Sequence, residues 1–364
     1  MGKTSIAREL GRRLCGENWQ FIFIDVEEAA TVEDVIALFA SGMRKVVPLG
    51  ARWKKLLGHA WTTYIEEVEL YDFSVRFRAQ VHSGNWKTIG QELIGFGAQH
   101  DQPVLLVIDE VPVFLQRLLR HQDGIEQVDG FLSWLRSTVQ QVPRDSLSLM
   151  VTGSIGLMPV VSRLGMPDRV NYLYPYRLGP WDRATSIECF NSLARSESIH
   201  VEPGVAQAAY DRLGIGIPYH VQLFFARIAD HARVQDRHMV TVADVETVYR
   251  QQLLGPEGQS GLLHYETRLH QVLDEDVDYA IAMTILAETA RRDEFAGASR
   301  QQVVARFSKL VSDANERVDT ILNILEHDGY LEHNVDRRLF FFPSRWLGDY
   351  WRIRYSATRS LHTG

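Results

Sequence analysis

The stretch Leu105-Leu106-Val107-Ile108-Asp109-Glu110 consists of four apolar residues followed by two carboxylates. Four consecutive apolar residues predict a strand that is buried on both faces of a parallel sheet. Such a strand ends at the carboxyl edge of the sheet, where α/β proteins bind their ligands. Two partly buried carboxylates at that edge destabilise the fold unless they bind a cation or take part in a proton transfer. A solvated strand end is the simpler alternative, and a phosphate-binding loop elsewhere in the chain would favour a functional site.

Half of such a loop stands at the start of the chain. Gly2-Lys3-Thr4-Ser5 matches the second half of the phosphate-binding pattern G-x-x-x-x-G-K-[ST]. In this pattern the glycine lets the backbone approach the phosphates, the lysine reaches the β and γ phosphates, and the threonine hydroxyl ligates Mg²⁺. Ile6, Leu10 and Leu14 follow at four-residue spacing and predict a helix whose amides point at the anion. A chance Gly-Lys-Thr at a frayed terminus is the alternative, which the Asp-Glu strand downstream disfavours.

Composition places limits on the class of protein. The chain has 364 residues, which is too long for one ordinary domain, and 45% of them are hydrophobic, which is enough for buried cores. The net charge of −7 argues against a generally basic nucleic-acid binder. The two cysteines, Cys15 and Cys189, fit no metal-binding spacing and indicate free thiols in a reducing, cytoplasmic compartment. No apolar run has the length of a membrane span, so no membrane partner is expected.

Two further segments predict strands of the same sheet. Residues 21–25 are apolar and end in Asp25, and residues 147–154 end in the hydroxyls of Thr152 and Ser154. These hydroxyls are candidates for contact with a γ-phosphate, or they begin an ordinary turn. Both interpretations stay open from the residues alone.

Other segments of the first half are less regular. Residues 170–178 carry strand-forming side chains and predict a fourth strand, while residues 68–77 alternate as in a strand with one wet face. Residues 113–129 are expected to form a loop with helical turns. Residues 86–98 and 130–142 have the apolar spacing of helices.

From Asp182 onward the pattern is helical. Asp182 and Thr241 are good helix N-caps, and the glycines of residues 255–261 predict a linker. Three helices are then expected, followed by a hairpin whose turn lies at residues 334–337, which predicts a winged helix-turn-helix. The helices are expected over residues 276–292, 299–310 and 313–327.

The order of these motifs resembles the AAA+-related STAND and archaeal-type P-loop ATPases, a group of ATP-binding proteins. The resemblance is carried by GKTS, LLVIDE, VTGSIG and a GIP before a helix, and by the phrases IDEVPVFL and DGYL. It covers most of the chain and is weak over residues 48–86. It implies an α/β fold with a P-loop NTPase parallel sheet, a helical lid and a winged helix. The domains are then expected over residues 1–179, 180–258 and 259–364.

The resemblance also implies a set of site residues. Gly2, Lys3, Thr4 and Ser5 correspond to the half-motif of Walker A, and Asp109 and Glu110 correspond to Walker B. Ser154 or Thr152 occupies the sensor position, while Gly216 and Pro218 match an element whose proline packs near the adenine. A helix start, where proline is favoured, is the alternative explanation of Gly216-Ile217-Pro218.

The activity that follows is ATP binding, with hydrolysis that drives a molecular switch. Phosphoryl transfer to water would use Mg²⁺ held by Thr4 and Asp109 and charge compensation by Lys3. The catalytic carboxylate of Glu110 would place the attacking water. A partner protein is expected to detect how the lid and winged helix pack, and assembly into oligomers is compatible with the resemblance.

The front of the motif is missing. The first glycine of Walker A and the central strand before it are absent, because the chain begins at Met1. We therefore expect the recorded start to lie downstream of the true one, or the chain to be a truncated product. Such a chain is expected to bind ATP poorly, so its status as an enzyme depends on a complete Walker A in the full-length protein.

Two other functions remain as alternatives. The first is a DNA-associated ATPase that resembles origin-recognition initiators. The helix expected over residues 313–328 argues against it, because its five acids face Arg317 alone and would repel phosphates. The arginines of the hairpin and of the last helix favour it. The alternative is that these arginines form the solvent-exposed face of a helix whose aromatic side chains point inward. The second alternative is a catalytically dead ATPase-like scaffold for protein contacts.

Overall fold

The structure, a computed structural model, describes residues 2–46, 75–98, 102–154, 156–273 and 276–355. The chain divides into two compact units at residues 177 and 178. The first unit is Gly2–Arg177 and the second is Leu178–Gly364. The finer division of the second unit at residue 258 stays a prediction.

A parallel sheet lies at the centre of the first unit. Its three strands run in the order β1 (Gln20–Asp25), β2 (Val104–Asp109) and β3 (Leu147–Val151). Every residue of β2 is buried, as its unbroken apolar sequence requires. Asp25 lies beside Asp109 in the register, so the carboxyl ends of neighbouring strands meet at one edge. The parallel sheet and its three expected strands are thereby confirmed.

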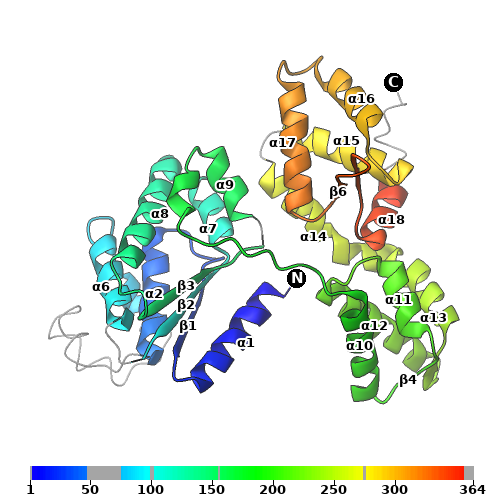
Figure 1. Cartoon of the computed structure of the whole chain (residues 1–364), viewed down its shortest axis with the longest axis horizontal. Coiled ribbons are helices and arrows are strands. Elements are labelled where there is room, and N and C mark those ends of the chain that lie inside the picture. Colours follow the sequence, from blue (N-terminus) through cyan, green and yellow to red (C-terminus); the bar gives the residue numbers. More distant parts are fainter. Residues whose placement is uncertain (1, 47–74, 99–101, 155, 274–275, 356–364) are drawn as a thin grey trace. The chain divides into compact units, whose positions relative to one another are not determined.

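Helices cover both faces of this sheet. The helix α1 (Lys3–Gly16) lies along one face, while α2 (Val32–Val46), α6 (Trp86–Ala98) and α8 (Gly124–Gln140) lie on the other (Figure 1). The remaining elements of the unit are α7 (Val111–Leu118), α9 (Leu157–Arg163) and the 3-10 turn η1 (Pro167–Val170).

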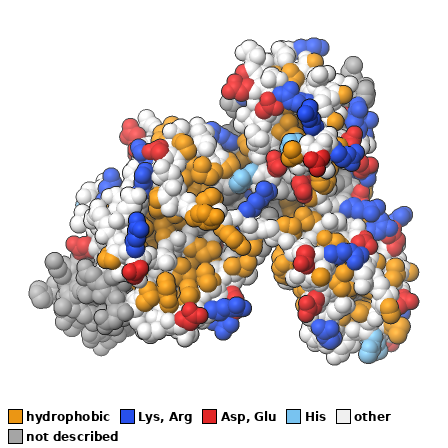
Figure 2. Space-filling model, in the orientation of Figure 1, with side chains coloured by type: hydrophobic (Ala, Val, Ile, Leu, Met, Phe, Trp, Pro, Cys, Tyr) orange, Lys and Arg blue, Asp and Glu red, His pale blue; other side chains and the backbone are white. Residues whose placement is uncertain are grey.

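The helix α1 packs with a different side from the one expected. Ala7 and Gly11 are buried, whereas Ile6 and Leu10 are 46% and 38% exposed. The reason is a close approach between helix and sheet, since a Cβ at Gly11 would lie 2.4 Å from the ring of Phe21. Small side chains fit at the point of closest approach, so Ile6 and Leu10 face outward, while Leu14 packs, partly buried, against the cluster of Ala7, Leu105 and Val107. Figure 2 shows a broad group of apolar side chains on the visible face of this unit.

On the opposite face, Trp134 of α8 joins three helices. Its ring packs at 5.3 Å from Trp86, and at 6.2 Å from Phe39 of α2. Its indole Nε1 donates a hydrogen bond of 3.0 Å to the carbonyl of Lys87. Gly90 of α6 is required at this point, because a Cβ there would lie 2.4 Å from the Trp134 ring. These contacts keep the helices on this face of the sheet in place.

The predicted fourth strand is wrong. Val170 ends η1, and residues 171–180 belong to no strand. A strand needs a neighbouring backbone to satisfy its hydrogen bonds, and none of the strands described in the structure pairs with this segment. Pro175 further lacks an N–H for such a ladder. Strand-forming side chains alone therefore did not make a strand here.

Two other predictions for this unit need correction. Residues 75–78 are helical rather than extended, while the rest of the expected strand, residues 68–74, lies outside the described residues. Residues 113–129, expected as a loop, contain most of α7 and the start of α8. Pro112 stands in the first turn of α7, where its missing N–H costs nothing.

The second unit begins with a helical half. Its elements are α10 (Arg183–Ser196), β4 (His200–Val201), α11 (Val205–Leu213), α12 (Pro218–Val234), β5 (Met239–Val240), α13 (Val242–Val248) and the π-helical turn η2 (Tyr249–Leu253). The short strands β4 and β5 pair in parallel.

Three helices and a hairpin follow in the C-terminal half, after one more helix. The elements are α14 (Pro256–Val272), α15 (Asp276–Arg292), α16 (Gly297–Phe307), α17 (Ala314–His327), the antiparallel strands β6 (Glu332–Asn334) and β7 (Leu339–Phe341), and α18 (Arg345–Arg354). The order predicted from the sequence, three helices followed by a hairpin and a last helix, is confirmed.

Residues 255–261 are not a linker, since α14 begins at Pro256. Their glycines allow close backbone packing instead of flexibility. A Cβ at Gly258 would lie 2.1 Å from the carbonyl oxygen of Gln252, and one at Gly255 would lie 2.0 Å from that of Gln251. The turn η2 and the helix α14 are therefore pressed together.

Contacts across residue 258 join the two halves of this unit. Trp346 of α18 donates from Nε1 to the carbonyl of Leu253 at 3.2 Å, and its ring packs edge-on against His220 at 4.8 Å. The hydroxyl of Tyr249 donates to Asp349 at 2.8 Å. Buried polar atoms that find their partners in the other half make separation of the halves costly.

A capping box begins α13. The Thr241 side chain accepts from the N–H of Asp244, and Asp244 accepts from the N–H of Thr241 at 2.8 Å. Burial disfavours the charge of Asp244, but hydrogen bonds from Arg237 and Thr241 outweigh burial and lower the pKa of this carboxyl to about 2. The folded state therefore prefers the ionised carboxylate.

We expect Asp244→Asn to lower the free energy of unfolding by about 1–3 kcal/mol at pH 7, because cap and ion pair are lost together. The pKa of the unfolded carboxyl is about 3.9, so the stabilisation is present above that pH and disappears as the pH falls toward 2. Urea unfolding at pH 7 and pH 3 measures both effects. Asp230→Asn, in an exposed ion pair with Arg233, is the matched control and should change stability little. If Asp244→Asn lowered the free energy of unfolding equally at pH 7 and pH 3, this explanation would be wrong.

Candidate functional site

Asp109, the last residue of β2, is only 2% exposed and lies between two hydroxyl groups. Thr4 of α1 donates from Oγ1 to Oδ2 of Asp109 at 2.6 Å. Thr152, which follows β3, donates from its hydroxyl to Oδ1. A buried carboxylate needs such donors to offset the loss of water. Thr4 and Asp109, expected together from the sequence, are therefore in direct contact.

The start of α1 has the properties of an anion site. Gly2 precedes the helix in a left-handed conformation with φ of 79°, which glycine adopts without strain. The first turn contains no acidic residue. The N–H groups at a helix start have no acceptor within the helix and favour a negative charge. The Lys3 ammonium donates to the carbonyl oxygen of Gly153. Ser5 is exposed in the same turn.

Glu110 has an unusual backbone. It precedes α7 with φ of 61°, a left-handed conformation that is uncommon for a residue with a side chain. Its carboxylate atom Oε2 accepts hydrogen bonds from both the N–H and the hydroxyl of Ser154, each at 2.7 Å. Strained residues of this kind persist where their surroundings enforce them.

The three residues Thr152, Gly153 and Ser154, called here the 152–154 segment, contact the candidate residues one by one. Thr152 binds Asp109, Gly153 binds Lys3, and Ser154 binds Glu110. The sequence left Thr152 and Ser154 as alternatives for one polar position. The structure gives them different partners, so each carboxylate has its own hydroxyl donor.

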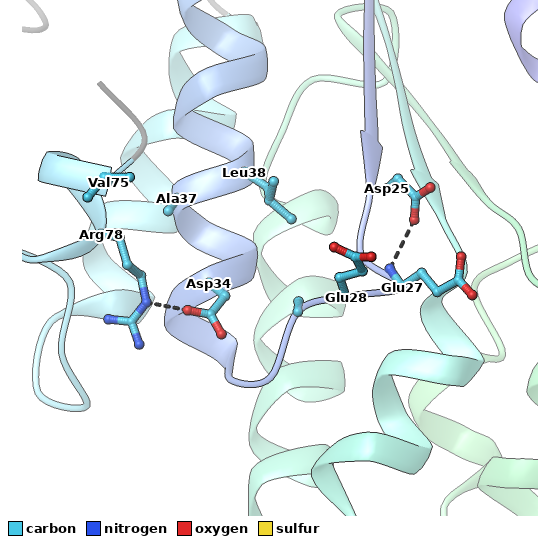
Figure 3. A pocket seen from close by; sticks show the side chains of 9 residues that line it. Asp25, Glu27, Glu28, Asp34, Ala37, Leu38, Val75 and Arg78 are labelled. Carbon is cyan, nitrogen blue, oxygen red and sulfur yellow. Dashed lines mark hydrogen bonds and ion pairs between the residues drawn. The ribbon is translucent and has the colours of Figure 1, made fainter. Parts of the chain in front are cut away.

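Acidic residues also follow β1 at the same edge of the sheet. They border a cavity of about 560 Å³ between the end of β1, α2 and residues 75–78 (Figure 3). On one side of it Arg78 forms an ion pair with Asp34 of α2, and Asp25, Glu27 and Glu28 lie on the other side (Figure 3). The lining residues are Asp25, Glu27, Glu28, Ala29, Asp34, Ala37, Leu38, Val75 and Arg78.

Glu27 is the residue of this group that the sequence analysis missed. Partial burial and the negative charges of Glu110, Asp25 and Glu28 raise the pKa of its carboxyl, against the opposing effect of Arg117. The influence of Glu110 places Glu27 within its electrostatic field. The signal was present in the sequence, because Asp25 ends a strand of the same sheet and Glu27 stands two residues beyond it.

We expect Glu27→Gln to raise the midpoint of urea unfolding slightly at pH 7. A carboxyl whose pKa is raised on folding disfavours the folded state once it is ionised, and this cost vanishes below about pH 4, where both states are protonated. Glu27 is largely exposed, so solvent screens most of the effect. Unfolding curves of Glu27→Gln and of the neighbouring control Glu28→Gln at pH 7 and pH 4 test this. A stabilisation by Glu27→Gln that persists at pH 4 would show a cause other than charge.

Gly216 and Pro218 belong to the second unit and have structural roles there. The carbonyl of Gly216 accepts from the N–H of Trp181 at 2.8 Å, and a Cβ at Gly216 would lie 2.3 Å from the hydroxyl of Ser186. Pro218 is the first residue of α12, where proline is favoured. These contacts account for both residues, and their contact with an adenine stays a prediction.

The residues present fit a magnesium ion that is shared with phosphates. Mg²⁺ takes few protein ligands and completes its shell with water and phosphate oxygens. The adjacent oxygens of Thr4 and Asp109 meet this requirement. Over the described ranges, no group of three or more His, Cys, Asp or Glu side chains is arranged to hold a metal by itself. The described helices also include none with the length and apolar character that crossing a bilayer requires.

No protein-family model and no curated protein matches this sequence. Solved structures do resemble it. The Aeropyrum pernix ORC2 protein, solved as ADPNP-ADP complexes, aligns with a TM-score of 0.54 and 13% identity over 98% of this chain and 86% of that chain. The ORC1 protein of the same organism in complex with DNA gives 0.40 and 15%, over 98% and 85%. The Thermotoga maritima RuvB Holliday junction branch migration motor gives 0.35 and 16%, over 70% and 80%.

Of these likenesses, only the first has a TM-score above 0.5, and at 13% identity it shows a shared fold. The chain thus has an α/β fold with a parallel sheet and many helices, in common with the ORC2 protein.

Proposed function

We propose that this chain is a P-loop protein of the AAA+ class that binds and hydrolyses ATP. The observation that carries the proposal is the meeting of Lys3, Thr4, Asp109 and Glu110 at the carboxyl edge of a parallel sheet. These residue types serve phosphate binding, magnesium binding and water activation in phosphoryl transfer. The fold shared with the ORC2 protein, whose structure holds ADPNP and ADP, supports the same ligand class.

Each residue has a distinct task in the proposed reaction. The N–H groups at the start of α1 and the Lys3 ammonium bind the phosphates and offset their charge. Thr4 and Asp109 would hold Mg²⁺, which supplies further neutralisation of phosphate charge when bound. Glu110 orients the attacking water and accepts its proton while the bond between the γ-phosphorus and the bridging oxygen breaks. Gly216 and Pro218 are the remaining residues proposed for contact with the nucleotide.

The second unit would convert the nucleotide state into an output. We assign a helical lid to residues 180–258 and a winged helix to residues 259–364, because three helices and a hairpin follow one another in the C-terminal half. A STAND-like switch, a protein partner and assembly into oligomers are parts of this proposal. The contacts of Trp346 and Tyr249 suggest that lid and winged helix respond together.

Lys3→Ala should weaken the binding of Mg-ATP by about 100-fold or more, because charge-assisted hydrogen bonds to two phosphates are lost. Arg13→Ala is the matched control, since Arg13 is an exposed cation on the same helix and pairs with Glu9. Titration calorimetry with Mg-ATP measures both variants.

Glu110→Gln separates binding from hydrolysis in the same assay. It should bind Mg-ATP like the wild type and lose at least about 100-fold in the rate of phosphate release. Absence of ATP binding by the wild-type chain would end the ATPase proposal in favour of the scaffold hypothesis. Binding without hydrolysis by the wild type would identify a nucleotide-binding protein that is catalytically inactive.

DNA association is the second candidate function, and the charges of the C-terminal half tell against it. Arg352 donates to the carbonyl of Ala290 at 2.7 Å and pairs with Asp349 at 2.9 Å, while Trp346 and Trp351 are buried. This supports the interpretation of α18 as a helix whose aromatic side chains pack inward. Arg359, a further arginine of the C-terminal segment that could contact DNA, lies outside the described residues.

On the outer side of α17 the exposed side chains include Glu316, which repels a phosphate backbone, whereas Asp319 is paired with Arg300 at 2.7 Å. We therefore expect no salt-dependent binding of a short DNA duplex by the full chain. Fluorescence anisotropy with a labelled duplex at about 50 mM and 200 mM salt checks this expectation. Binding that weakens steeply as the salt rises would instead favour the DNA-associated ATPase.

A further inference from the structure

Ser154 holds the Glu110 carboxylate with two donors on one oxygen. The backbone N–H and the side-chain hydroxyl of Ser154 both reach Oε2 of Glu110 at 2.7 Å. Hydrogen bonds to an ionised acceptor are shorter and stronger than neutral ones, and two of them from one residue fix a direction as well as a distance. Neither residue is buried, so this contact is what orders the carboxylate against solvent.

The backbone on both sides of this contact is tied to the sheet. The N–H of Thr152 donates to the carbonyl of Ile108 at 3.0 Å, and the N–H of Val111 donates to the carbonyl of Thr152 at 3.2 Å. The ladder between β2 and β3 therefore continues past both strand ends to the residues that flank Glu110. Ser154 follows Thr152 by two residues. Glu110 lies between Ile108 and Val111, the two residues that are hydrogen-bonded to Thr152.

The same segment defines the direction in which Glu110 points. Gly153, the neighbour of Ser154, accepts a hydrogen bond from the Lys3 ammonium. Ser154 thereby draws the Glu110 carboxylate toward the side of the site where Lys3 would meet the terminal phosphates. A group that activates water must first be placed correctly, and its basicity matters only after that.

We propose that Ser154 is a positioning residue for Glu110. This inference rests on the proposed ATPase function. It differs from a sensor that reads the γ-phosphate, because both donors of Ser154 are directed at Glu110. Ser154 then acts on the chemical step through Glu110, and its loss leaves the affinity for nucleotide unchanged.

The test compares Ser154→Ala, Ser154→Thr and the control Ser148→Ala, an exposed serine on β3. The affinity for Mg-ATP is measured by titration calorimetry, and the rate constant for hydrolysis is measured by phosphate release over a range of ATP concentrations. Ser154→Ala should lower kcat by about 10- to 100-fold and leave the Kd within about twofold. Ser154→Thr keeps the hydroxyl and should recover most of kcat, and Ser148→Ala should behave like the wild type.

The double variant Ser154→Ala with Glu110→Gln decides whether the two residues act together. If Ser154 works through Glu110, the double variant hydrolyses ATP at the same residual rate as Glu110→Gln alone. A further loss of rate in the double variant, or a weakening of ATP binding by Ser154→Ala that matches its loss of rate, would overturn the inference and favour a phosphate sensor. Unchanged kcat in Ser154→Ala would overturn it as well. If the wild-type chain binds no ATP, the proposed function itself fails, a result that is already distinguished by the titration.

Discussion

The hydrogen bonding of one buried carboxylate holds the candidate site together. Asp109 ends a strand that is buried along its whole length, so its charge lies where water cannot solvate it. Removing an ion from water costs several kcal/mol unless donors replace the water, and here the hydroxyls of Thr4 and Thr152 do so. Because these donors belong to α1 and to the segment after β3, satisfying one carboxylate brings three parts of the chain to the same edge.

The burial of Asp109 also shapes the residue after it. Asp109 still belongs to β2 and α7 begins at Val111, so the chain must change direction at Glu110 alone. This single-residue turn explains the left-handed backbone of Glu110, a conformation that costs about 1–3 kcal/mol for a residue with a side chain. It also sends the Glu110 side chain toward Ser154, away from the interior occupied by Asp109. Two adjacent acids thus have different surroundings, which is what different chemical tasks require.

In the second unit, aromatic side chains and ion pairs hold the helices together. His220, Tyr265 and Trp346 come from three helices. The centroid of the His220 ring lies 6.2 Å from that of Tyr265 and 4.8 Å from that of Trp346. Arg317 of α17 pairs with Asp278 at 2.9 Å, and Arg352 of α18 pairs with Asp349 at 2.9 Å. Charges that are consumed within the fold are not available to a phosphate backbone.

The sequence alone determined the features that depend on neighbours along the chain. The apolar run before Asp109 specifies a buried strand, the caps at Asp182 and Thr241 specify helix starts, and their positions in the structure agree. The pairing of Gly2-Lys3-Thr4 with Asp109 could also be inferred, because the chemistry of phosphate binding requires both. The first signals depend only on neighbouring residues, and the last depends on the known requirement of phosphate binding for both motifs.

Only the tertiary structure decided which surfaces meet. The close approach at Gly11 turned α1 away from its expected apolar face, and residues 170–178 formed no strand because no described strand pairs with them. The separate partners of Thr152 and Ser154, and the position of Glu27 in the field of Glu110, depend on distances between residues far apart in the chain. Periodicity and propensity report the preference of a segment, but steric fit and hydrogen-bond partners are properties of the assembled fold.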